Sequence, residues 1–158
     1  MSSIVMRDFS ETQPPLLWRN TPDNLVFKRV ETPRQTKINV QQYVSARYTD
    51  LKNSIEEVMR ECAEDDWDEE GSLAVNKNSV EFALQYFSIF IEGELPHISC
   101  DPFGCIIAEW YGNAALAAIA FQTDKVYHVL GYNKKIRHFS KKTDDSRMAH
   151  KFIAELGF

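Results

Sequence analysis

The chain has 158 residues and a mass of 18.3 kDa, which suits a single domain. Apolar residues make up 44% and charged residues 26%, with 6 glycines and 6 prolines, so collagen-like, low-complexity and wholly disordered proteins are excluded. No stretch approaches the ~18 apolar residues of a membrane span, and residues 1–10 have no apolar signal core. We therefore expect a cytoplasmic protein whose three cysteines are reduced.

The charge is distributed unevenly along the chain. Residues 1–45 carry six basic and four acidic side chains, residues 46–124 carry four basic and sixteen acidic, and residues 125–158 carry eight basic and three acidic. The formal net charge of −5 therefore hides an acidic middle and a basic C-terminal part. Such an asymmetry indicates charged partners rather than a particular fold.

The N-terminal part of the chain is interrupted by prolines, which disfavour long regular elements. We expect an extended arm over residues 1–39 and a single domain over residues 40–158. Leu16, Leu17 and Trp18 are too apolar for a solvated tail. They are expected to dock on the domain or on a second copy of the chain, which predicts a homodimer or a larger homo-oligomer.

Apolar residues at three- and four-residue steps predict helices. Residues 40–62 carry one such stripe, which begins with Val40 and Val44. Residues 79–92 carry another, with Asn78 as the N-cap and Gly93 at the C-terminal cap. A last helix is expected over residues 145–156, with Met148 among its buried residues.

From residue 97 the apolar period changes to two, which predicts strands over 97–101, 105–111, 114–121 and 126–132. Short turns between them, one at residues 112–113, imply an antiparallel meander. The fold class is therefore α+β: a four-stranded antiparallel meander packed by two to three helices, with one sheet face covered and an extended N-terminal arm.

Six of the eight residues at positions 64–71 are acidic, around one tryptophan. This pattern is compatible with a surface that imitates phosphates and binds a basic protein, with Trp67 as an aromatic anchor. The alternative is a solvated loop whose Trp67 plugs the core and whose Gly71 supplies a turn. The residues of the predicted partner-binding segment are Glu64, Asp65, Asp66, Trp67, Asp68, Glu69 and Glu70.

A basic run with an interleaved aromatic residue follows the last predicted strand. Its members are Lys134, Lys135, Arg137, Lys141 and Lys142. Such clusters release counterions when they bind phosphates, so the run is the alternative, nucleic-acid-binding segment. We prefer the interpretation that this basic end complements the acidic segment within the fold or across an oligomer.

No catalytic motif can be assembled, so we expect a non-enzymatic protein without a cofactor. Glu109 and His128 leave one alternative open, a small hydrolase or lyase, if both side chains face one pocket. A zinc site built from His97 and the three cysteines, Cys62, Cys100 and Cys105, is disfavoured because residues 102–104 fit a hairpin turn, and we expect no metal.

Two motifs together resemble small uncharacterised bacterial and phage proteins. They are Trp67-Asp68-x-x-Gly71 and Asp101-x-x-Gly104-x-Ile106-x-x-Glu109-Trp110, within residues 60–132. The resemblance implies a shared fold and a role like that of the accessory genes of mobile elements, such as antitoxins or anti-defence proteins. It implies no catalytic residues.

These observations predict an interaction protein that binds and inhibits or regulates a macromolecular partner through the acidic segment. The expected partner is a protein, such as a basic nuclease or a nucleic-acid-handling complex. Direct binding of nucleic acid by the basic run is the alternative, and no membrane partner is expected.

Overall fold

A computed structural model describes residues 39–158 of the chain. The predicted arm, apart from Asn39, lies outside the described residues, together with the docking expected for its apolar side chains. The described elements are α1 (Val40–Glu61), α2 (Lys77–Phe87), β1 (His97–Cys100), β2 (Ile106–Tyr111), β3 (Ala115–Phe121), β4 (Tyr127–Asn133), β5 (Phe139–Thr143) and α3 (Ser146–Glu155).

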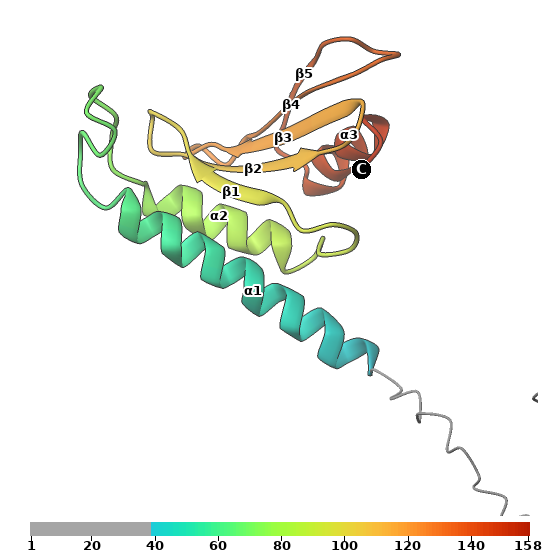
Figure 1. The fold of residues 1–158 in the computed structure, drawn as a ribbon, viewed down its shortest axis with the longest axis horizontal. Helices are drawn as coiled ribbons and strands as arrows, with labels where there is room; N and C mark the ends of the chain where they lie inside the picture. The colour runs from blue at the N-terminus through green and yellow to red at the C-terminus, as the bar shows by residue number, and fades with distance from the viewer. Residues whose placement is uncertain (1–38) are drawn as a thin grey trace, which may run out of the picture. The chain divides into compact units, whose positions relative to one another are not determined.

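The strands form one antiparallel meander in the order β1-β2-β3-β4-β5 (Figure 1). The α+β class is confirmed, but the sheet has five strands rather than four. The extra strand is β5, and the sequence pattern assigns its lysines to the basic run without predicting a strand there. Two of its five residues are lysines, which weakens the apolar signal, whereas lysine is well tolerated on an edge strand.

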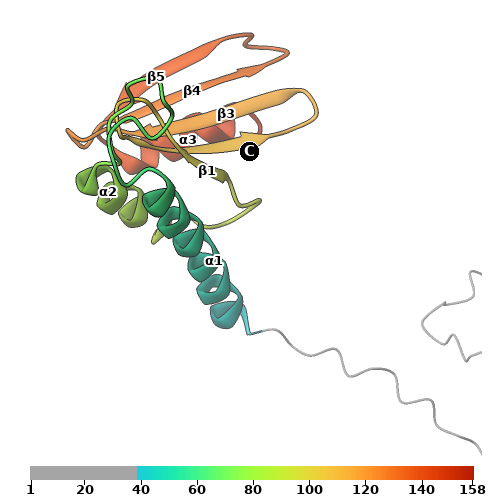
Figure 2. The same ribbon diagram turned by 60° about the vertical axis from the view of Figure 1, so that its left-hand side comes forward.

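The helices cover one face of the sheet. α1 lies against β1, α2 against β2 and β3, and α3 against β4 and β5. Figure 2 shows the other face without a helix over it. The core between the layers includes Ile55 of α1, Tyr86 of α2, Phe121 of β3 and Val129 of β4, all almost fully buried. This two-layer arrangement leaves the opposite face of the sheet open.

The first helix is confirmed, with Asn39 as its N-cap accepting a hydrogen bond from the Gln41 N–H. Its buried residues, however, begin only at Leu51. The expected burial of Val40 and Val44 is wrong, because the N-terminal half of α1 extends past the other elements (Figure 1).

The second helix is shorter than predicted. It begins after Asn76, whose side-chain oxygen accepts from the Asn78 N–H, so Asn78 is not the cap. It ends at Phe87, six residues before Gly93, because the Ile89 and Phe90 N–H groups both donate to the Tyr86 carbonyl in a tightened last turn.

Two smaller expectations also need correction. The turn between β2 and β3 is displaced by one residue, since the Gly112 N–H donates to the Ala115 carbonyl and leaves Asn113 and Ala114 at the tip. Met148 of α3 is exposed, while Ala149 and Ile153 point into the core. No helix within residues 39–158 is both long and apolar enough to cross a membrane.

Candidate functional site

The open face of the sheet gathers exposed aromatic and aliphatic side chains. The registers place Tyr111 of β2, Leu116 of β3 and Tyr132 of β4 side by side in one row across the sheet. Their exposed fractions are 61%, 37% and 42%, unusually large for apolar side chains that adjoin one another on a strand surface. The imidazole of His138, 6.0 Å from the Tyr132 ring, continues the row. We call this row the aromatic row.

A shallow depression of about 540 Å³ lies at the β4–β5 end of the aromatic row. It is lined by Leu116, Leu130, Tyr132, His138 and Ser140, together with backbone at Gly131 and Phe139. The neighbouring side chains Ala118 and Ala120 on β3 are small. The middle of the open face is therefore recessed between the larger side chains on β2 and β4. A flat aromatic ring could lie in this depression.

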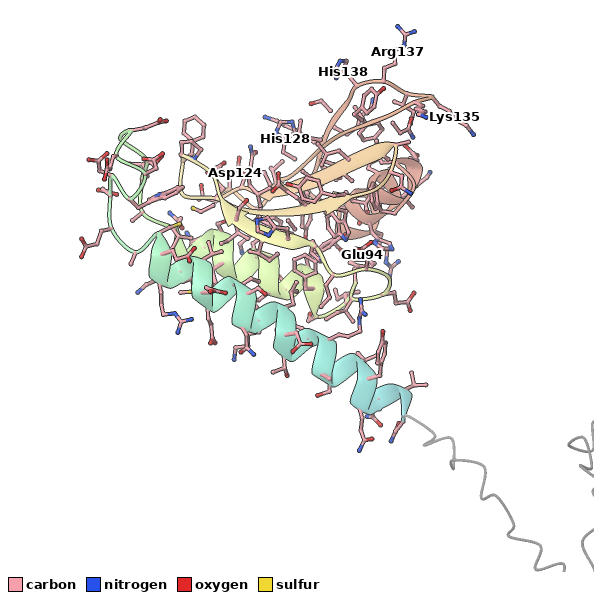
Figure 3. The ribbon with its side chains drawn as sticks, viewed as in Figure 1. Glu94, Asp124, His128, Lys135, Arg137 and His138 are labelled. Atoms are coloured by element: carbon pink, nitrogen blue, oxygen red, sulfur yellow. The ribbon has the colours of Figure 1, made fainter. Side chains whose placement is uncertain are left out.

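The turn between β4 and β5, residues 134–138, projects beyond the aromatic row and is hereafter the basic hairpin. The side-chain oxygen of Asn133 accepts from the Lys135 and Ile136 N–H groups at 3.0 and 2.6 Å, which holds the turn. Arg137 adopts a left-handed conformation, with φ of 65°, and its N–H donates to the Asn133 carbonyl. The backbone thus presents Lys135 and Arg137 on a fixed turn (Figure 3).

The structure divides the basic run predicted from sequence. Lys134, Lys135 and Arg137 lie in the basic hairpin. On β5, Lys142 pairs with His128 and faces the open side, whereas Lys141 pairs with Val129 and lies on the helix side. The sequence alone could not make this division, because the strand itself was not predicted.

The acidic segment, residues 64–70, forms a loop with an internal hydrogen-bond network; we call it the acidic loop. The Asp65 carboxylate accepts from the Ala74 N–H and the Asp66 carboxylate from the Gly71 N–H, at 2.8 and 2.7 Å. The Asp68 carboxylate accepts from the backbone N–H groups of Glu70 and Ser72 and from the Ser72 hydroxyl. This last contact is the main reason that the pKa of Asp68 is lowered.

Half of the acidic side chains therefore shape the loop, and the remaining ones, Glu64, Glu69 and Glu70, are exposed at its surface. Trp67 is half-buried, packs against the core, and donates its indole N–H to the Leu73 carbonyl at 3.1 Å. Trp67 thus fills space at the edge of the core. Its ring is less available to anchor a protein partner than the partner-binding hypothesis requires.

The segment that follows the first motif is hydrogen-bonded to the second motif. The Leu73 N–H donates to the Pro102 carbonyl and the Asn76 N–H to the Gly104 carbonyl, at 2.9 and 2.8 Å. Gly104 has φ of 80°, and a Cβ there would stand 2.4 Å from the Ala74 carbonyl oxygen. The glycine is therefore required for the close approach of residues 73–76 to the β1–β2 turn.

Glu109 and His128 share the open face but do not meet. Glu109 pairs with Ala118 of β3, while His128 pairs with the neighbouring Ala120, so their backbones are separated by two strand spacings, about 10 Å, plus a register step. The Glu109 carboxylate accepts from the Tyr111 hydroxyl at 2.9 Å. The His128 Nε2 lies 3.0 Å from the Ser140 Oγ. Each side chain has its own partner, and the geometry does not form the acid–base pair of the enzyme hypothesis.

The thiols do not assemble a metal site in the described part of the chain. Cys100 pairs with Ile106 across β1 and β2, so Cys105 lies just beyond the ladder rather than opposite Cys100. Within residues 39–158 no group of three or more histidine, cysteine or acidic side chains is arranged to hold a metal ion. Burial raises the pKa of Cys100 to about 12, which keeps this thiol protonated.

The acidic loop and the basic hairpin lie at opposite ends of the strands. Residues 73–76, which follow the acidic loop, are hydrogen-bonded to the β1–β2 turn, whereas the basic hairpin extends from the end of the sheet where β2 turns into β3. Figure 3 shows Lys135, Arg137 and His138 gathered at the hairpin, far from that loop. The row that Tyr111 forms with Leu116 and Tyr132 depends on the strand registers, which the sequence pattern does not predict.

Comparisons with family models, with curated proteins and with solved structures found no match to this chain.

Proposed function

We propose that this protein is a non-catalytic binding protein that holds single-stranded nucleic acid across the open face of its sheet. The observation that carries this proposal is the aromatic row, which ends at the basic hairpin. Bases that are not paired stack on exposed aromatic rings, typically for about 1–3 kcal/mol per base. Lysine and arginine beside the rings bind the phosphates that connect those bases.

The spacing of the aromatic row suits a short stretch of unpaired nucleotides. Tyr111 and Tyr132 lie two strands apart, or about 10 Å. Leu116 between them supplies an apolar floor, and His138 adds a ring beside Tyr132. A duplex keeps its bases stacked inside and offers no faces to these rings, which is why the proposal is restricted to single strands.

The overall negative charge does not oppose this site. Among the strand residues of the open face, Glu109 is the one carboxylate, and it accepts a hydrogen bond from Tyr111. The acidic loop lies at the far end of the sheet. At physiological ionic strength salt screens exposed charges over about 8–10 Å, so the basic hairpin dominates the electrostatic potential at the aromatic row.

The proposal is tested by fluorescence anisotropy with a labelled single-stranded oligonucleotide over a range of salt concentrations. Replacing Lys134, Lys135 and Arg137 with Glu is expected to abolish binding, because it removes phosphate contacts. Replacing the same residues with Gln is expected to reduce the slope of log K against log salt by about 2, since each contact contributes about 0.7 on single strands. Tyr111→Ala with Tyr132→Ala is expected to weaken binding at every salt concentration without changing that slope.

A matched control keeps the net charge change but moves it away from the site. Lys77, Arg147 and Lys151 are exposed on α2 and α3, on the other side of the sheet. Changing these residues to Glu is expected to leave binding within about twofold, apart from a general charge effect. Equal losses in the control and the hairpin variant, or no binding by the parent protein at low salt, would refute the proposal.

The acidic loop favours a second candidate function, capture of a basic protein. Its network of backbone and carboxylate contacts holds Glu64, Glu69 and Glu70 on a preorganised surface, and preorganisation lowers the entropic cost of binding. An antitoxin-like or anti-defence-like role, with a nuclease or a nucleic-acid-handling complex as partner, remains a proposal of this kind.

The second candidate function can be tested by changing the three exposed glutamates of the acidic loop. Changing Glu64, Glu69 and Glu70 to Lys reverses the exposed charge and spares the three aspartates that shape the loop. The control changes Glu57, Glu81 and Glu155 to Lys, which are exposed elsewhere. A pull-down from the native host, washed at moderate salt, is expected to lose its protein partner only with the loop variant. Loss with both variants, or recovery of nucleic acid alone, contradicts this candidate.

A further inference from the structure

A pocket of about 260 Å³ lies within the helical layer, on the side of the sheet opposite the open face. It is formed where the end of α2, the loop that follows it, β2 and α3 come together. Its volume is just below the ~300–1,000 Å³ of sites for drug-sized ligands, so it suits a small chemical group. The lining residues include Tyr86, Phe90, Glu92, Glu94, Trp110 and His150.

The walls of this pocket are mostly aromatic. Phe90 and His150 stack with ring centroids 4.4 Å apart, and Tyr86 lies 4.9 Å from Phe90. Trp110 contributes its indole from β2, and Phe158 also lines the pocket. Burial raises the pKa of Tyr86, so its hydroxyl stays protonated, 3.3 Å from the Nδ1 of His150. The rings are therefore held in place by one another and by this polar contact.

The charged groups at the pocket are carboxylates. Glu92 and Glu94 lie at its rim, and none of the described lysines or arginines lines it. The ion pair that the described residues form is Lys52–Glu56, so neither rim carboxylate is neutralised by a salt bridge there. Arg47 approaches from α1, but its guanidinium donates to the carbonyls of Ile91 and Gly93 rather than to a carboxylate.

The loop that carries these carboxylates is fixed from both sides. Arg47 holds the carbonyls at positions 91 and 93, and the Trp110 indole N–H donates to the Glu94 carbonyl at 3.0 Å. Figure 3 shows Glu94 on this loop between α2 and β1. The aromatic walls and the negative rim thus exist before any ligand binds, which lowers the cost of binding.

We propose that this pocket binds a quaternary ammonium group. Aromatic faces attract cations through their quadrupoles, and the carboxylates at the rim add a longer-range attraction of the same sign. A primary ammonium is strongly hydrated and needs hydrogen-bond acceptors that the rings do not supply. A methylated ammonium is weakly hydrated and matches an aromatic enclosure. The group belongs either to a free small molecule such as choline or to a trimethylated lysine side chain.

The test titrates choline into the full-length protein and follows the indole N–H signal of Trp110 by NMR. A neutral isostere of choline, in which carbon replaces the charged nitrogen, controls for shape and apolarity. We expect choline to shift the Trp110 signal saturably and the isostere to bind about tenfold more weakly, or not at all. Equal binding of the two, or no shift at millimolar choline, would overturn the proposal.

Two variants separate the contributions of the walls and the rim. Phe90→Leu keeps an apolar side chain but removes a ring, and we expect it to weaken choline binding between about twofold and thirtyfold. Glu92→Gln with Glu94→Gln is expected to weaken binding about threefold at low salt, and less at high salt. If Phe90→Leu lowers the melting temperature too far for measurement, the glutamine variant alone decides.

The controls are Phe103→Leu and Glu81→Gln, an exposed ring and an exposed carboxylate outside the pocket. Both are expected to bind choline as the parent does, and pocket variants that also bind unchanged would refute the site. A peptide with trimethyllysine and the same peptide with lysine identify the source of the group. Tighter binding of the methylated peptide than of choline points to a protein ligand, and the reverse points to a free small molecule.

Discussion

Replacement of Ser79 by alanine is the sharpest test of how α2 is joined to the sheet. Ser79 is fully buried at the start of α2. Its hydroxyl donates to the Phe121 carbonyl at 2.5 Å and accepts from the Ile106 N–H at 2.7 Å. One side chain therefore satisfies a backbone group on β3 and another on β2.

The expected cost follows from the two buried hydrogen bonds that alanine cannot make. Ile106 and Phe121 are themselves fully buried, so water has little access to their backbone atoms. A buried polar group without a hydrogen bond costs about 1–3 kcal/mol. Two such groups, with some relaxation of the strands, predict that Ser79→Ala lowers the free energy of unfolding by about 2–5 kcal/mol. That is a large part of the about 5–15 kcal/mol typical of a domain.

Urea unfolding followed by circular dichroism measures this difference. The slope of the free energy against urea should stay constant, because alanine does not change the surface that unfolding exposes. Ser88→Ala is the matched control, since its exposed hydroxyl donates only to the Gln85 carbonyl, and we expect a change below about 0.5 kcal/mol. A Ser79→Ala protein as stable as that control would refute the bridging role.

Three further predictions concern the β1–β2 turn, a histidine and a thiol. Gly104→Ala should destabilise the domain by about 2 kcal/mol or more, measured by urea unfolding, because its Cβ would collide with the Ala74 carbonyl at a left-handed residue. Burial, and to a smaller extent the nearby Lys142, lowers the pKa of His128 below its ordinary value of 6.5. The unfolded chain therefore binds more protons than the folded protein, and the free energy of unfolding falls as the pH drops through about 6.5. His128→Asn should flatten that pH dependence in thermal melts, and an unchanged profile would contradict it. Cys100, with its pKa near 12, should alkylate far more slowly at pH 8 than an unfolded thiol, as followed by mass spectrometry.

Local patterns were sufficient for most of the elements. The apolar stripe predicted α1 within one residue, and the apolar period of two predicted β2 within one residue. β3 is also confirmed, although its alanines favour a helix in isolation. The turns on either side of β3 and the partners β2 and β4 outweigh that preference, because a strand gains hydrogen bonds from both neighbours.

Other features of the fold have weak local signals. β5 carries two lysines and depends on its pairing with β4, so its sequence looks like a charged loop. The start of α2 depends on which of two nearby asparagines caps it, and Asn76 is selected because the segment before it is hydrogen-bonded to the β1–β2 turn. Neither choice is visible in a single stretch of sequence.

The sequence by itself determined the composition of the two charged regions and the α+β class, because both follow from residue type and local periodicity. The tertiary structure decided what those residues do. It paired three aspartates of the acidic loop with backbone N–H groups, separated Glu109 from His128, and aligned Tyr111, Leu116 and Tyr132 in one row. These outcomes depend on strand register and on loop docking. Register shifts of a single residue reverse the face on which a side chain lies, so no local pattern can replace the packed structure.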